Sequence, residues 1–132
     1  MRLPFMLIAL SGLLYAPAGS ARGENPAETA VARTVAEIVT FRLAPGVDQA
    51  GFLRAASQTR GFVAAAPGFI ARTLTRGDDG LWTDYILWRD MKAAKMMADA
   101  FMSEPSVKPF LQAIDPKSVT MRHETVLWQM QQ

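Results

Sequence analysis

The stretch FIARTLTRGDDGLWTDYILWR, residues 69–89, decides the fold because it holds two strand-like runs joined by a short turn. β-branched and aromatic residues dominate residues 69–76 and 81–89, whereas only glycine and aspartate occur at residues 77–80. Glycine and aspartate at the turn between two such runs are typical of a tight β-hairpin. The sequence therefore predicts an antiparallel strand pair in the middle of the chain.

Before this hairpin the sequence predicts one strand and one helix. Residues 34–43 are dense in β-branched residues and end at a Pro-Gly turn, as a strand does. Asp48 follows, and its carboxylate can accept the free N–H groups at the start of a helix. Apolar residues at helical spacing continue from there to about residue 66, where Ala-Pro-Gly ends the helix.

After the hairpin the same pattern of a helix and a strand returns. Asp90 is placed to cap a helix over residues 91–103, which carries an apolar stripe. Residues 107–114 are expected to add a short helical turn, and residues 118–130 are expected to form a long last strand.

The resulting order β-α-β-β-α-β predicts an α+β, ferredoxin-like fold. Right-handed connections place the four antiparallel strands in the order 4-1-3-2, with both helices on one face. Apolar residues nevertheless occupy both faces of the sheet: in the first strand, Val39 and Phe41 alternate with Ala36 and Ile38. The helices cover one of these faces, so the other apolar face needs a partner of its own. We therefore expect a homodimer in which two sheets pack face to face as a dimeric α/β barrel.

Composition limits the classes of function. The chain has 132 residues, and its 14 basic and 12 acidic residues give a net charge of +2 without a basic cluster. That balance argues against a nucleic-acid partner. Because the chain has no cysteine and a single histidine, disulfides, thiolate metal sites and multi-histidine metal sites within one chain are excluded. We expect no metal and no cofactor.

The first residues have the pattern of a secretory signal peptide over residues 1–21. One basic residue precedes an apolar run at residues 3–14, and small residues then offer cleavage after Ala18 or Ala21. A run of about 12 apolar residues is shorter than the ~20 that span a bilayer. We expect a periplasmic or secreted protein with no stable membrane insertion once the segment is cleaved.

Two further segments follow the predicted signal peptide. Residues 22–33 are rich in Ala, Glu, Gly and Pro and lack an apolar period, which predicts a flexible leader. The folded domain is then expected over residues 34–130. A domain of about 100 residues buries only about two-thirds of its surface, so association with a second copy would stabilise it.

Several motifs are spread over most of this domain: EIVTFRLAPGV (37–47), APGF (66–69), Trp88 with Asp90, and FMSEP (101–105) with KPF (108–110). They resemble the dimeric α/β-barrel superfamily, in particular the antibiotic-biosynthesis-monooxygenase-like proteins and the stress-responsive A/B barrels. The resemblance implies the fold more than an activity, because oxygenases, isomerases and haem-degrading enzymes share it. Relatives that act on haem have histidines where this chain has Phe101, Met102 and Ser106. The resemblance therefore carries over no haem ligand and no catalytic residue.

The last predicted strand holds the only histidine, His123, between Arg122 and Glu124. Alternation sends His123 to one face of the sheet and its two neighbours to the other. Because this strand lies beside the first in the predicted order, His123 is expected near Glu37. Such a pair can exchange a proton near neutral pH. The alternative is a structural hydrogen bond at the edge of the core.

The third strand places Trp82, Asp84, Tyr85 and Trp88 at the centre of the sheet. Aromatic rings beside a carboxylate can line a pocket for a planar aromatic or quinol-like ligand. The alternative is that Trp88 fills the core that faces the helices and Trp82 fills the dimer seam.

These patterns predict an exported, monooxygenase-like dimeric barrel protein that binds a small apolar or aromatic molecule. Cofactor-independent monooxygenase chemistry is its candidate activity, and the alternative is a non-catalytic structural or interaction module that acts through its dimer surface. The candidate catalytic residues are His123 and Asp84. The candidate ligand-binding residues are Glu37, Trp82, Tyr85 and Arg122.

Overall fold

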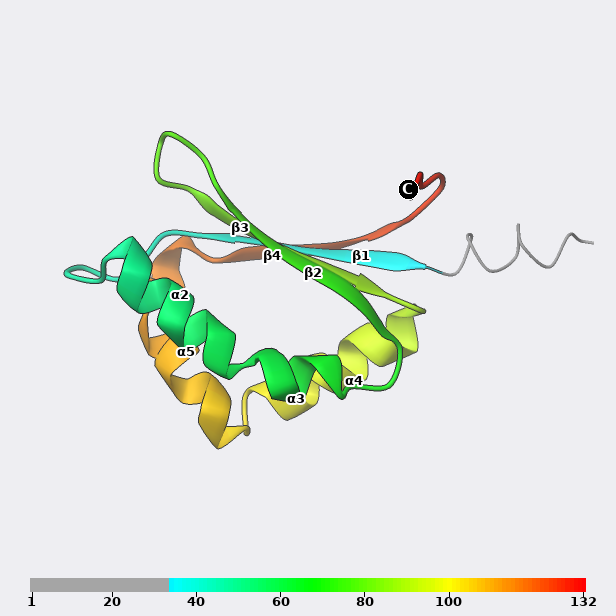
Figure 1. Cartoon of the computed structure of the whole chain (residues 1–132), viewed down its shortest axis with the longest axis horizontal. Helices are drawn as coiled ribbons and strands as arrows, with labels where there is room; N and C mark the ends of the chain where they lie inside the picture. The colour runs from blue at the N-terminus through cyan, green and yellow to red at the C-terminus, as the bar shows by residue number, and fades with distance from the viewer. Residues whose placement is uncertain (1–33) are drawn as a thin grey trace, which may run out of the picture.

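The computed structural model describes residues 34–132 and contains one four-stranded antiparallel sheet (Figure 1). The strands are β1 (Val35–Phe41), β2 (Phe69–Arg76), β3 (Trp82–Trp88) and β4 (Thr120–Thr125). Their order, β2-β3-β1-β4, is the predicted order 4-1-3-2 read from the opposite edge. The α+β, ferredoxin-like fold is thereby confirmed. The predicted signal peptide (1–21) and leader (22–33) lie outside the described residues.

The helices gather on one face of this sheet (Figure 1). They are α2 (Gln49–Gln58), α3 (Arg60–Ala64), α4 (Met91–Phe101) and α5 (Lys108–Gln112), with single 3-10 turns η1 (Pro105–Val107) and η2 (Pro116–Ser118). Within residues 34–132, no helix has the length and apolar character needed to cross a membrane.

Both predicted N-caps are present. The side chain of Asp48 accepts a hydrogen bond from the Gly51 backbone N–H at 2.7 Å, and that of Asp90 accepts one from the Ala93 N–H at 2.8 Å. The Ala93 N–H holds the pKa of the Asp90 carboxyl below its ordinary value, because the bond favours the charged form. These caps fix where α2 and α4 begin beneath the sheet.

The single helix predicted up to residue 66 is divided into α2 and α3 at Thr59. Thr59 is fully buried, and its hydroxyl donates to the Ala56 carbonyl at 2.7 Å while accepting from Arg72 on β2. A threonine bonded back to the preceding turn competes with the helical ladder. The break therefore depends on a tertiary contact that hydrophobic spacing does not reveal.

The last strand is shorter than predicted, since it ends at Thr125 rather than at residue 130. Its neighbour β1 begins at Val35, and the bond from the Val126 N–H to the Thr34 carbonyl is the last link between the two segments. Beyond that point no strand within residues 34–132 pairs with the chain, and Leu127 and Trp128 are highly exposed.

The turn from α3 into β2 requires a glycine at residue 68. Gly68 has a φ of +84°, and a Cβ there would lie 2.6 Å from the Cβ of Ala93. Because of the positive φ and the close approach, any residue larger than glycine would be unfavourable at this position. This contact holds the first turn of α4 against the entry to β2.

The two faces of the sheet carry separate apolar clusters. On the helix side, Trp82 is buried and its ring lies 4.7 Å from that of Phe52 on α2. The interpretation that Trp82 fills a dimer seam is therefore wrong, because this residue has the same parity as Trp88 and faces the helices. On the opposite face the cluster consists of Ala36, Ile38 and Leu87, with Val126 packed against it.

Candidate functional site

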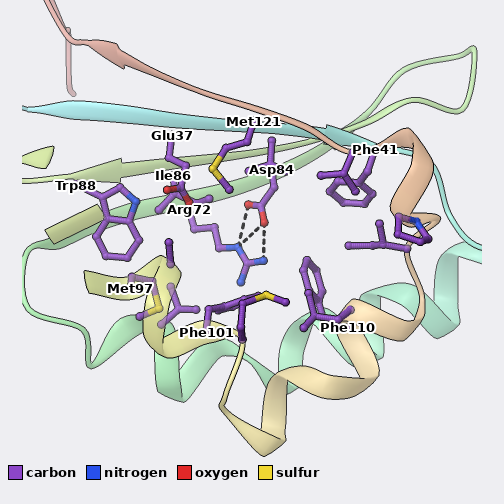
Figure 2. A pocket seen from close by; sticks show the side chains of 18 residues that line it. Glu37, Phe41, Arg72, Asp84, Ile86, Trp88, Met97, Phe101, Phe110 and Met121 are labelled. Atoms are coloured by element: carbon purple, nitrogen blue, oxygen red, sulfur yellow. Dashed lines mark hydrogen bonds and ion pairs between the residues drawn. The ribbon is translucent and has the colours of Figure 1, made fainter. Parts of the chain in front are cut away.

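A cavity of about 520 Å³ lies between the sheet and the helices (Figure 2). Its walls are apolar except for three charged residues, Glu37 on β1, Arg72 on β2 and Asp84 on β3. All three project from the sheet, whereas α4 and α5 contribute apolar side chains such as Met97, Phe101 and Phe110. The polar groups are thus confined to one side of an apolar chamber.

Arg72 and Asp84 form a buried ion pair in the wall of this cavity. Arg72 Nε donates to Asp84 Oδ1 at 2.9 Å and Nη2 donates to Oδ2 at 2.6 Å, and the side chains are 13% and 6% exposed. The remaining Nη1 donates to the Thr59 hydroxyl at 2.7 Å, and the guanidinium carbon lies 5.1 Å from the centre of the Phe110 ring. Because both Asp84 oxygens are engaged, Asp84 is better suited to hold Arg72 in place than to take up a proton.

Glu37 and His123 form a second polar pair, as the predicted alternation implied. The two residues are directly opposite each other on β1 and β4. His123 Nε2 lies 2.8 Å from Glu37 Oε2. Glu37 lines the cavity and His123 does not. Glu37 therefore stands between the cavity and the histidine.

Trp88 lines the same cavity and carries an unpaired polar atom. Its side chain is 1% exposed, and its ring lies edge-on to Phe69 with centroids 5.9 Å apart. Among the side-chain atoms of residues 34–132, its Nε1 is the one buried nitrogen or oxygen without a hydrogen-bond partner. Figure 2 shows this nitrogen on the side of the ring turned toward Glu37. A buried N–H group without an acceptor is unfavourable and calls for an explanation.

The other predicted ligand-binding residues lie outside the cavity. Trp82 lies on the helix side of the sheet, but its ring packs against Phe52 and does not line the cavity. Tyr85 and Arg122 are both paired with Ile38 in the sheet and face away from the helices, and Arg122 bonds to Glu124 at 2.7 Å. A pocket that Trp82, Asp84 and Tyr85 line together is not formed, because alternation separates Tyr85 from the other two.

Sequence reasoning missed Arg72 as a site residue. Its parity on β2, shared with Leu74, would have placed it on the face toward the helices. The available signal was thus an arginine at a strand position that faces the helices. Its pairing with Asp84 also depends on the register between β2 and β3, which is shifted by an irregularity between Phe69 and Ala71.

No group of three or more His, Cys, Asp or Glu side chains in the described part of the chain is arranged to hold a metal ion. The charged groups of the cavity instead form the two pairs described above. Such a site can bind an apolar molecule, orient one polar group of it and exchange a proton with it.

No protein-family model and no curated protein sequence matches this chain significantly. Among solved structures, the chain is similar to the cofactor-independent oxygenase SnoaB from Streptomyces nogalater, with 23% identity, a TM-score of 0.51 and coverage of 76% of this chain and 96% of that one.

Two further similar structures are candidate antibiotic biosynthesis monooxygenases. The one from Bordetella bronchiseptica is 21% identical, with a TM-score of 0.55 and coverage of 70% of this chain and 95% of that one. The one from Chloroflexus aurantiacus is 12% identical, with a TM-score of 0.56 and coverage of 74% and 97%. The chain therefore has the fold of the antibiotic biosynthesis monooxygenase-like proteins.

Proposed function

We propose that this protein binds a small planar aromatic molecule in the cavity between the sheet and the helices. The volume of about 520 Å³ is within the range of small-molecule sites, and an apolar wall with a few convergent polar groups is typical of them. The observation that carries the proposal is the unpaired Trp88 Nε1, since an acceptor on a bound molecule would complete it.

In this proposal the sheet orients the molecule and the helices enclose its rings. An oxygen of the ligand accepts a hydrogen bond from Trp88 Nε1, while Met97 and Phe101 pack against the aromatic faces. Arg72, bonded to Asp84, adds a fixed ion pair to the same wall. The ligand is thus expected to carry an oxygen at one edge of an otherwise apolar ring system.

Calorimetric titration with 1-methoxynaphthalene tests this proposal, because that probe has an acceptor oxygen and no donor. We expect one molecule to bind per chain, and Trp88→Phe to raise its Kd roughly fivefold to tenfold through loss of one hydrogen bond. Trp128→Phe is the matched control, because Trp128 is 76% exposed in the C-terminal segment. Absence of binding, or equal affinity in both variants, would contradict the proposal.

We further propose that the bound molecule is oxidised without a cofactor. The fold is shared with a protein described as a cofactor-independent oxygenase, and in such chemistry the deprotonated substrate itself supplies electrons to oxygen. For a hydroxyanthrone, the ring CH₂ and O₂ give C=O and H₂O. We expect the protein to accelerate oxygen uptake by 1,8-dihydroxyanthrone above the spontaneous rate. No acceleration would support the non-catalytic alternative.

We also propose that two copies associate through the sheet face opposite the helices. No helix of residues 34–132 covers that face in Figure 1. It carries the cluster of Ala36, Ile38 and Leu87, and the neighbouring Tyr85 is 38% exposed. Packing of this face against a second copy would remove its apolar side chains from water, which favours association.

A further inference from the structure

The Glu37 carboxylate has one oxygen committed to a partner and one free. Oε2 pairs with His123 Nε2 at 2.8 Å, while Oε1, which is not among the fully buried atoms, receives no hydrogen bond from any residue in the range 34–132. The side chain is 10% exposed and lines the sheet side of a cavity whose walls are mostly apolar. A carboxylate in such surroundings is unfavourable unless hydrogen-bond donors satisfy both of its oxygens.

His123 lies on the outer side of this carboxylate. Its side chain is 22% exposed, and it belongs to β4, which is an edge strand of the sheet. Glu37 lines the cavity, whereas the partly exposed His123 does not. The bonded pair therefore connects the cavity with solvent. Histidine is the side chain best suited to pass protons near neutral pH.

A single chemical group on a ligand would satisfy both unpaired atoms of the cavity. Glu37 Oε1 needs a donor, and Trp88 Nε1 needs an acceptor. A hydroxyl group donates one hydrogen bond and accepts others, whereas an ether or ketone only accepts. A cationic amine would lack the acceptor that Trp88 Nε1 needs.

Building on the proposed function, we propose that Glu37 recognises a phenolic hydroxyl of the bound molecule and that His123 carries its proton to solvent. The ligand class is therefore a hydroxyarene. In the transfer step the phenolic O–H bond breaks, its electron pair stays on the ligand oxygen, and the proton joins the Glu37–His123 pair. Arg72 and the Trp88 N–H then face the phenolate, while Asp84 remains bonded to Arg72.

The first test compares 1-naphthol with 1-methoxynaphthalene by calorimetric titration. We expect wild-type protein to bind 1-naphthol roughly tenfold to a hundredfold more tightly than the ether, because a hydrogen bond to a charged group is stronger than average. Glu37→Gln keeps the side-chain size and should remove most of this preference. Asp99→Asn is the matched control, because Asp99 is exposed on α4 and does not line the cavity.

The second test uses the fact that His123 is the only histidine in the chain. In untagged wild-type protein, the imidazole ¹⁵N resonances therefore report on this residue alone. We expect 1-naphthol to shift them toward the imidazolium values and 1-methoxynaphthalene to leave them unchanged. A purely structural Glu37–His123 bond would not distinguish the two probes.

These experiments test the role of Glu37 and His123 separately from ligand binding in the cavity. If both probes bind with equal affinity, or if the imidazole resonances do not respond to 1-naphthol, the role of Glu37 and His123 is wrong while binding in the cavity stands. If neither probe binds, the cavity proposal itself is wrong. Circular dichroism of Glu37→Gln verifies its fold, and the resonance test needs no variant.

Discussion

Asp84→Ala is expected to lower the free energy of unfolding by about 3–5 kcal/mol, because it leaves a buried guanidinium without its carboxylate. The Arg72 side chain is 13% exposed, and three of its hydrogen bonds go to Asp84. Urea unfolding followed by circular dichroism measures the change. Asp99→Ala is the control: it removes an exposed carboxylate from α4 and should cost less than about 1 kcal/mol.

The double variant Arg72→Met with Asp84→Ala should recover much of this loss. Removing both charges leaves no unpaired ion in the cavity wall, and replacing a buried pair by apolar groups is often neutral for stability. A single Asp84→Ala variant as stable as the Asp99→Ala control would show that Arg72 finds another partner or reaches water. In that case the ion pair would not be a fixed part of the cavity wall.

Tyr85→Lys is expected to convert a dimer into a monomer at micromolar concentration, with the dissociation constant raised a hundredfold or more. In a twofold interface the substitution occurs on both subunits, so two ammonium groups would be buried near each other. The monomer should tolerate the change, since Tyr85 is 38% exposed within one chain.

Sedimentation velocity of wild type, Tyr85→Lys and Met96→Lys makes this comparison. Met96 is 54% exposed on α4, on the helix side of the molecule, so its lysine variant should remain dimeric. A wild-type protein that sediments as a monomer would contradict the proposed association through the open face of the sheet.

Local patterns in the sequence predicted the strand order and the meeting of Glu37 with His123. Both depend on short-range information: the order of elements along the chain selects the topology, and alternation along β1 and β4 selects the face. The caps at Asp48 and Asp90 were predictable for the same reason, since a cap is a contact between residues three positions apart.

The remaining features depend on contacts between distant segments. The Arg72–Asp84 pair requires the register of β2 against β3 and the irregularity near Phe69. The division between α2 and α3 follows from the bond between Thr59 and Arg72. The cavity exists because α4 and α5 leave a space below the sheet, and helix packing of this kind cannot be derived from periodicity along one helix.

A crystal structure of the protein with 1-methoxynaphthalene would show where an aromatic molecule resides. Ligand binding in the cavity predicts electron density for the naphthalene rings between β3 and the helices α4 and α5, with the ether oxygen within hydrogen-bond distance of Trp88 Nε1. A cavity closed by the protein's own side chains, with Trp88 Nε1 bonded to another residue, would contradict it.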